Sequence, residues 1–289
     1  MLDRDHLASL KPKTPPLSRR ALFKTSLSAG FCAAVSPVWA QAISTPSVGL
    51  IAGEVKIASA GFDVPSYRAM PDKGGPFPVV LVIPEIFGVH EYIKDVCRRW
   101  AKLGYYALAM ELSARQGDAS AQTDIGKLMG EIIGKIPDAQ VAADLDAGIA
   151  YAAKSGSGDV ARAAVTGFCW GGRQSLLYAA HNPSLKAAVA WYGPLGGAAS
   201  ELRPKSALEL APTIKVPVLG LYGAKDSGIP ADQVAQLRST LDAAGKGSKI
   251  IVYGDAGHAF HADYRPSYVK ADAEASWKEA TAWLKGHGV

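Results

Sequence analysis

Short apolar runs alternate with amphipathic stretches along most of the chain, which is the pattern of strands followed by helices. The runs at residues 53–60 and 66–69, joined by a turn around 61–63, predict two short opening strands. The run at 78–83 is apolar throughout, as is typical of a strand covered on both faces. Further strands are expected at residues 105–112, 161–166, 185–192, 216–222 and 249–253. Helices are expected at residues 91–103, 140–154, 173–180, 232–244 and 268–285. The alternation predicts an α/β domain with a mostly parallel, doubly wound sheet flanked by helices.

One connection is longer than the others. Residues 113–137 are rich in small and polar side chains and contain only a weak helical patch at 125–136. A connection of this length is unusual inside a compact domain, so we expect it to form a lid or a pocket wall.

Residues 1–40 have the features of a signal peptide rather than of the folded domain. They contain the pair Arg19 and Arg20, an apolar stretch at 27–38 interrupted by Pro37, and a possible cleavage point after Ala40. This arrangement resembles a twin-arginine signal peptide, and the apolar stretch is short for a membrane anchor. We therefore expect export by the twin-arginine machinery to the periplasm or beyond, with no stable membrane anchor after cleavage. A disordered basic tail is the alternative.

Cleavage would change the charge of the protein. The full chain of 289 residues has 31 basic and 26 acidic side chains, and residues 1–40 hold six of the basic and two of the acidic ones. The remainder has 25 basic and 24 acidic side chains and a net charge of +1. The sequence therefore gives no reason to expect a nucleic-acid partner. Residues 41–52 are interpreted as a linker, and residues 53–289 have the size of one domain.

The pentapeptide GFCWG at residues 167–171 lies between a predicted strand and a predicted helix. This is the G-x-nucleophile-x-G elbow of the α/β-hydrolase fold, with Cys169 as the nucleophile. A cysteine attacks as its thiolate and needs a histidine base held by a third group. His258 follows the last predicted strand and Asp226 the strand before it, which is the expected order. Asp255 is the nearest rival acid.

The elbow also predicts the oxyanion hole. One backbone N–H should come from Trp170, just after the nucleophile, and the other from Ile86, on the loop after the strand at 78–83. Glu85 lies beside Ile86, among apolar neighbours.

Other interpretations remain open. Cys169 could be a redox-sensing thiol in a protein that binds a ligand without hydrolysing it, although Cys97 lies on the apolar side of its predicted helix and is a poor resolving partner. A metal site at His258 and His261 lacks a helix and a third ligand, so neither a metal nor an organic cofactor is expected.

Several motifs together resemble the dienelactone hydrolase family, also called carboxymethylenebutenolidases. They are PEIFGVH at 84–90, ARQ at 114–116, GFCWGG at 167–172, GAKD at 223–226 and GHAF at 257–260. The resemblance extends from about residue 53 to the C-terminus. It implies a Cys169–Asp226–His258 triad that opens an ester or lactone through an acyl-enzyme. It also implies that Glu85 contacts the resting thiol and that Arg115 binds a substrate carboxylate.

One position departs from the family pattern. The family has a second carboxylate-binding arginine four residues after the histidine, where this chain has Ala262. Arg265 is near in the sequence, but it could equally be neutralised by Asp263 at the surface. The physiological substrate is left open by this difference.

Overall fold

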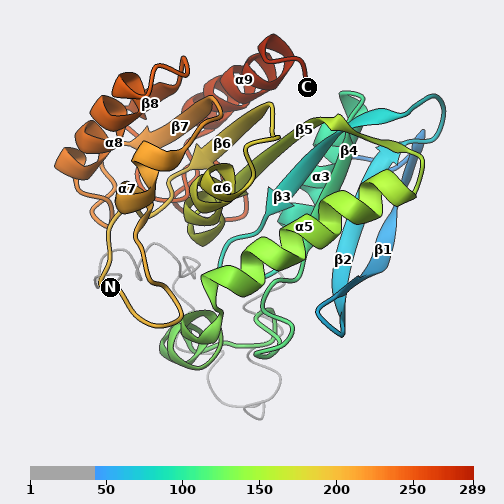
Figure 1. Cartoon of the computed structure of the whole chain (residues 1–289), viewed down its shortest axis with the longest axis horizontal. Coiled ribbons are helices and arrows are strands. Elements are labelled where there is room, and N and C mark those ends of the chain that lie inside the picture. Colours follow the sequence, from blue (N-terminus) through green and yellow to red (C-terminus); the bar gives the residue numbers. More distant parts are fainter. Residues whose placement is uncertain (1–42) are drawn as a thin grey trace, which may run out of the picture.

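The structure, a computed structural model, describes residues 43–289. The expected signal peptide at 1–40 lies outside the described residues. The described chain forms one eight-stranded sheet in the order β1-β2-β4-β3-β5-β6-β7-β8 (Figure 1). The strands are β1 (Leu50–Ser59), β2 (Phe62–Pro71), β3 (Phe77–Ile83), β4 (Tyr106–Met110), β5 (Gly158–Phe168), β6 (Ala187–Trp191), β7 (Val218–Gly223) and β8 (Lys249–Tyr253).

The sheet is parallel from β4 to β8, whereas β1 and β2 pair antiparallel at one end, and β2 also runs antiparallel to β4. This confirms the predicted α/β fold with a mostly parallel sheet. The opening hairpin differs in detail. Strand β1 begins at Leu50, inside the expected linker, and the turn is made by Ala60 and Gly61, both at positive φ.

Helices cover both faces of the sheet (Figure 1). The longer ones are α3 (Glu91–Lys102), α5 (Asp138–Lys154), α6 (Trp170–His181), α8 (Ala231–Ala243) and α9 (Lys270–Gly286). Helices α3 and α9 share one face, where the rings of Trp100 and Trp277 lie 4.5 Å apart. Helices α5 and α6 pack together on the other face. Among residues 43–289, no helix is both long and apolar enough to cross a membrane.

The strand order brings the loops that carry the candidate site residues together at the carboxyl ends of the parallel strands. Strands β3 and β5 are neighbours in register, with Ile83 opposite Gly167. Every residue of β3 from Val79 to Ile83 is buried, as the continuous apolar run predicts. The segments after these two strands therefore emerge side by side at the carboxyl ends, where ligands bind in sheets of this kind.

The long connection is helical where the sequence predicts a weak helical patch, at 125–136. It includes α4 (Ile125–Lys127), the π-helical turn η1 (Leu128–Ile132) and the 3-10 turn η2 (Ile133–Lys135). The side chain of Asp124 accepts a hydrogen bond from the Lys127 N–H and starts α4. A second stretch without helix or strand follows β6 and ends at α7 (Ala207–Leu210), which a reciprocal Ser206–Glu209 capping box begins.

Candidate active site

Cys169 occupies a strained turn between β5 and α6. Its φ is 54°, a value that L-residues rarely adopt, and its N–H donates to the Trp191 carbonyl over 3.0 Å. A Cβ on Gly167 would lie 2.2 Å from the Gly171 carbonyl oxygen, and one on Gly171 would lie 2.4 Å from the Ile83 carbonyl oxygen. Both glycines are therefore required by close packing, as the elbow motif predicts.

The histidine and aspartate predicted for the triad are hydrogen-bonded. His258 Nδ1 lies 2.7 Å from Asp226 Oδ2, and both side chains are buried. The other oxygen of Asp226 accepts the Gly228 N–H over 3.0 Å. The rival Asp255 is exposed and pairs with Lys225 over 2.8 Å, so it does not hold the imidazole. The structure thus joins Asp226 to His258 as the sequence predicts, and their catalytic roles stay a prediction.

A cavity of about 460 Å³ opens over the carboxyl ends of the strands. Cys169, Trp170 and Ile86 all line it, so the predicted nucleophile and the two predicted oxyanion donors share one space. Met129, from the long connection, lines it as well, as expected of a pocket wall. The volume suits a small-molecule substrate.

Glu85 is fully buried, and its charge acts on the Cys169 thiol. Its Oε2 accepts hydrogen bonds from the Tyr264 hydroxyl at 2.5 Å and from Arg265 Nη2 at 3.0 Å, and His90 Nε2 lies 4.0 Å away. Its Oε1 is buried with no hydrogen-bond partner in the described part of the chain. One oxygen of Glu85 is therefore fixed by an ion pair, and the other makes no hydrogen bond to Cys169 or to any other described residue.

Arg265 turns inward, contrary to the surface neutralisation by Asp263 that the sequence left possible. Its side chain is 2% exposed and its guanidinium lies 5.0 Å from the Phe87 ring centre. Asp263 instead pairs with Arg99 over 2.5 Å. Successive turns after His258 rotate the chain so that Arg265 reaches Glu85.

The thiol of Cys169 is held in its protonated form. Burial is the main cause, and the Glu85 carboxylate adds to it, so that the pKa of Cys169 rises to about 12. Arg265 and the Trp170 N–H act in the opposite direction, and Asp226 raises the pKa slightly further. Glu85, Arg265 and Asp226 are thus all close enough to influence the thiol electrostatically. The only other described cysteine, Cys97, is a free thiol that is fully buried in α3, where burial raises its pKa as well.

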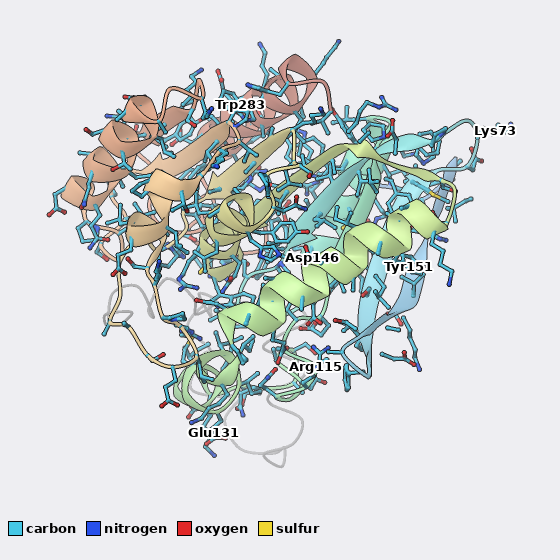
Figure 2. All side chains as sticks on the ribbon, viewed as in Figure 1. Lys73, Arg115, Glu131, Asp146, Tyr151 and Trp283 are labelled. Carbon is cyan, nitrogen blue, oxygen red and sulfur yellow. The ribbon has the colours of Figure 1, made fainter. Side chains whose placement is uncertain are left out.

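The structure does not bring Arg115 to this cavity. Its guanidinium forms two hydrogen bonds with Asp144 of α5, at 2.6 and 2.9 Å, and a third with the Ser59 carbonyl at 2.8 Å. Figure 2 shows it below α5, on the side of β1 and β2. The basic side chains that do line the cavity are Arg173, Arg203 and Lys205.

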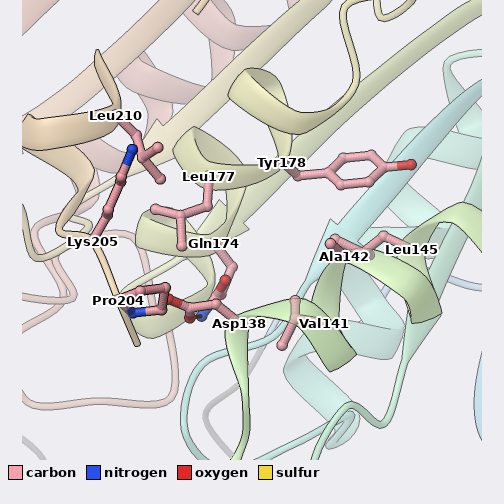
Figure 3. A pocket seen from close by; sticks show the side chains of 10 residues that line it. All are labelled: Asp138, Val141, Ala142, Leu145, Gln174, Leu177, Tyr178, Pro204, Lys205 and Leu210. Atoms are coloured by element: carbon pink, nitrogen blue, oxygen red, sulfur yellow. Dashed lines mark hydrogen bonds between the residues drawn. The ribbon is translucent and has the colours of Figure 1, made fainter. Parts of the chain in front are cut away.

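A smaller pocket of about 170 Å³ lies between α5 and α6 (Figure 3). Its walls are mostly aliphatic, with Asp138 and Lys205 at one end. Asp138 also receives two hydrogen bonds from Arg173, at 2.7 and 2.8 Å. This pocket shares Lys205 with the cavity of about 460 Å³, but Cys169 does not line it.

Sequence reasoning missed three contributors to the site: Tyr264, Arg265 inside the protein, and Arg203 in the cavity. For Arg265, a usable signal was the segment from His258 to Ala262, which contains Ala259 and Phe260 and is buried throughout. Arg203 lies in a segment without helix or strand, where no periodicity shows which side chains face a ligand.

The chain is similar in sequence and fold to several known proteins. The model of the Dienelactone hydrolase family matches residues 64–288. A protein of Methylorubrum extorquens described as "Putative carboxymethylenebutenolidase" is 56% identical over 284 residues, which cover 98% of this chain and 97% of the relative. A protein of Escherichia coli K12 with the same description is 49% identical, over 91% of this chain and 97% of its own. The crystal structure of a "Putative Dienelactone Hydrolase" from Klebsiella pneumoniae is 52% identical, with a TM-score of 0.79, over 82% of this chain and 98% of its own.

Proposed function

This chain belongs to the dienelactone hydrolase family and is a carboxylic ester hydrolase, and from that premise we propose that it cleaves a lactone or ester by attack of the Cys169 thiolate. The observation that carries the proposal is the shared cavity. The elbow cysteine faces the same space as the Trp170 and Ile86 backbone, beside a buried Asp226–His258 hydrogen bond. A redox-sensing role is not favoured, because the family comparison indicates a hydrolase and Cys97 is fully buried.

The first half of the reaction forms an acyl-enzyme. His258 takes the proton from the Cys169 Sγ, while Asp226 holds the Nδ1–H of the imidazole and stabilises the resulting cation. The thiolate attacks the carbonyl carbon, and the N–H groups of Trp170 and Ile86 bind the oxyanion. Collapse of the tetrahedral intermediate breaks the C–O bond, and His258 returns its proton to the departing oxygen. In a lactone that oxygen stays attached to the acyl chain.

The second half releases the acid. His258 removes a proton from water, the hydroxide attacks the thioester carbonyl, and the thiolate leaves and regains the proton. In the resting state, the negative charge of Glu85 raises the pKa of Cys169 and so disfavours the free thiolate. A buried thiol with a pKa of about 12 is largely protonated until His258 accepts its proton.

The proposal is tested by hydrolysis of a para-nitrophenyl acyl ester and of a dienelactone by wild type, Cys169→Ala and Cys97→Ala. Cys97 is the matched control because it is the other described thiol and is buried in α3. We expect wild type and Cys97→Ala to be active on at least one substrate, and Cys169→Ala to be inactive on both. Turnover by Cys169→Ala at the wild-type rate would contradict the proposal, as would inactivity of folded wild type on both substrates.

We further propose that the protein is exported by the twin-arginine route and works in the periplasm or outside the cell. The support is the sequence of residues 1–40, with Arg19 and Arg20 before an apolar stretch. Replacing both arginines with lysine should retain the precursor in the cytoplasm, as seen by fractionation of spheroplasts and N-terminal sequencing. Export of this variant at the wild-type level would contradict the route.

A further inference from the structure

We propose that Arg203 determines the substrate preference of this site by binding a carboxylate on the substrate, a role that rests on the proposed hydrolase function. The resemblance to the family assigned such a contact to Arg115. The structure keeps Arg115 on Asp144, and Arg203 lines the cavity that holds Cys169.

Arg203 is held at the junction of two cavity walls. Its backbone exchanges hydrogen bonds with Ser200, over 2.9 and 3.1 Å, so the loop after β6 is fixed at this point. Its Nη2 donates to the Ile133 carbonyl of η2, in the long connection that also supplies Met129 to the cavity. The guanidinium is therefore positioned by the protein before a ligand arrives, which lowers the entropic cost of binding.

Arg203 forms no ion pair among the described residues, whereas the other two basic side chains in the cavity are better compensated. Arg173 forms a two-pronged ion pair with Asp138, and Lys205 is exposed and lies within electrostatic reach of Glu209. Arg203 has no carboxylate within 4 Å in the part of the chain described, and its Nε is buried without a hydrogen-bond partner. Partial burial and the charge of Arg173 lower the pKa of Arg203, and the smaller opposing effect of Asp138 does not offset them. An incoming anion would relieve both effects.

A carboxylate is the anion that this guanidinium fits. The planar group offers parallel N–H donors to two carboxylate oxygens, and such charge-assisted hydrogen bonds are stronger than neutral ones. No carboxylate side chain lines the cavity among residues 43–289, so nothing in the described walls repels such a group. The scissile carbonyl can then lie at Cys169 while the carboxylate of the same molecule lies at Arg203, within one cavity of about 460 Å³.

The test compares two para-nitrophenyl esters of similar size, the neutral butyrate and the anionic hemiglutarate, with wild type, Arg203→Gln and Arg115→Gln. We expect Arg203→Gln to lower kcat/KM for the hemiglutarate by about 10- to 100-fold, the usual effect of losing a charged hydrogen bond, and to change the butyrate by less than about twofold. Arg115→Gln is the matched control, and the ratio of the two kcat/KM values should stay as in wild type.

The outcomes separate this inference from the proposed function. If wild type hydrolyses both esters and Arg203→Gln lowers both equally or neither, the assignment of Arg203 is wrong and the hydrolase proposal stands. If wild type hydrolyses neither ester nor a dienelactone, the proposed function itself fails. Arg203→Lys serves as a second variant in case Arg203→Gln does not fold. Lysine keeps the charge but loses the two-pronged contact, so kcat/KM should fall by less, and only for the hemiglutarate. An unchanged ratio in the lysine variant, together with an unfolded Arg203→Gln, would also overturn the assignment.

Discussion

Replacing Glu85 with glutamine should make Cys169 more reactive towards iodoacetamide, and replacing Arg265 with glutamine should make it less reactive. The pKa of the thiol is about 12, raised first by burial and then by the Glu85 carboxylate, while Arg265 lowers it. Removing the negative charge lets the thiolate form more easily, and removing the positive charge has the opposite effect.

The size of the effect follows from two opposing factors. A single charge close to a titrating group shifts its pKa by about one to three units, which changes the thiolate fraction at pH 8 by about 10- to 1,000-fold. Nucleophilicity falls as the pKa falls, with a Brønsted coefficient near 0.5, so about half of the change on a logarithmic scale is lost. We therefore expect alkylation to be about 3- to 30-fold faster in Glu85→Gln and slower by a similar factor in Arg265→Gln.

The assay is the rate of carbamidomethylation of the peptide that contains Cys169, measured at pH 8 by mass spectrometry. Cys97 is an internal control, because its reactivity should stay low in every folded variant. Each substitution leaves one buried charge of the Glu85–Arg265 pair without its partner and should cost about 3–5 kcal/mol of stability, so urea unfolding must first show that the variants are folded. Equal rates in the three folded proteins, or changes in the reverse direction, would refute the electrostatic account of the resting thiol.

Four further predictions follow from the geometry. Asp226→Asn should lower kcat by about 10²- to 10⁴-fold with little change in folding, because the imidazole loses the acceptor at 2.7 Å; steady-state kinetics measure this, and a loss below about threefold would contradict it. Gly171→Ala should lower the melting temperature by about 2–12 °C, because its Cβ would lie 2.4 Å from two carbonyl oxygens and the overpacking should cost about 1–3 kcal/mol. Gly53→Ala is the control: its Cβ meets nothing within 4 Å, so it should be near neutral in the same thermal scan. Arg115→Gln should destabilise the fold by about 3–5 kcal/mol in urea, since Asp144 is buried; stability equal to wild type would show that the pair contributes nothing. Alkylation of wild-type Cys169 should rise about tenfold for each pH unit from about pH 7 to 10, because the pKa of about 12 lies above this range; a plateau below pH 8 would indicate an ionised thiol in the resting enzyme.

The sequence was sufficient for the features that depend on local patterns. The apolar run that became β3 and the GFCWG elbow each carry their structural signal within a few residues, and the structure confirms both. The pairing of His258 with Asp226 could be predicted because parallel strands end at one edge of the sheet, where the loops that follow them meet.

The features that the sequence did not predict depend on contacts between distant segments. Arg115 meets Asp144 only because α5 crosses the sheet beside β1, and Arg265 meets Glu85 across 180 residues of chain. Spacing along the chain cannot decide whether an arginine pairs with a nearby carboxylate or with a distant one. Burial decides it, because an unpaired charge in the interior is strongly unfavourable.

The most direct test of the central claim is to trap the acyl-enzyme. Wild-type protein is mixed with excess para-nitrophenyl acetate, quenched in acid after less than one turnover and digested for mass spectrometry. The account predicts one acetyl group on the peptide with Cys169 and none on the peptide with Cys97, and accumulation of the thioester in Asp226→Asn if deacylation slows more than acylation. Turnover with no acetyl group on Cys169, or acetylation of a different residue at the catalytic rate, would contradict the claim that this cysteine is the nucleophile.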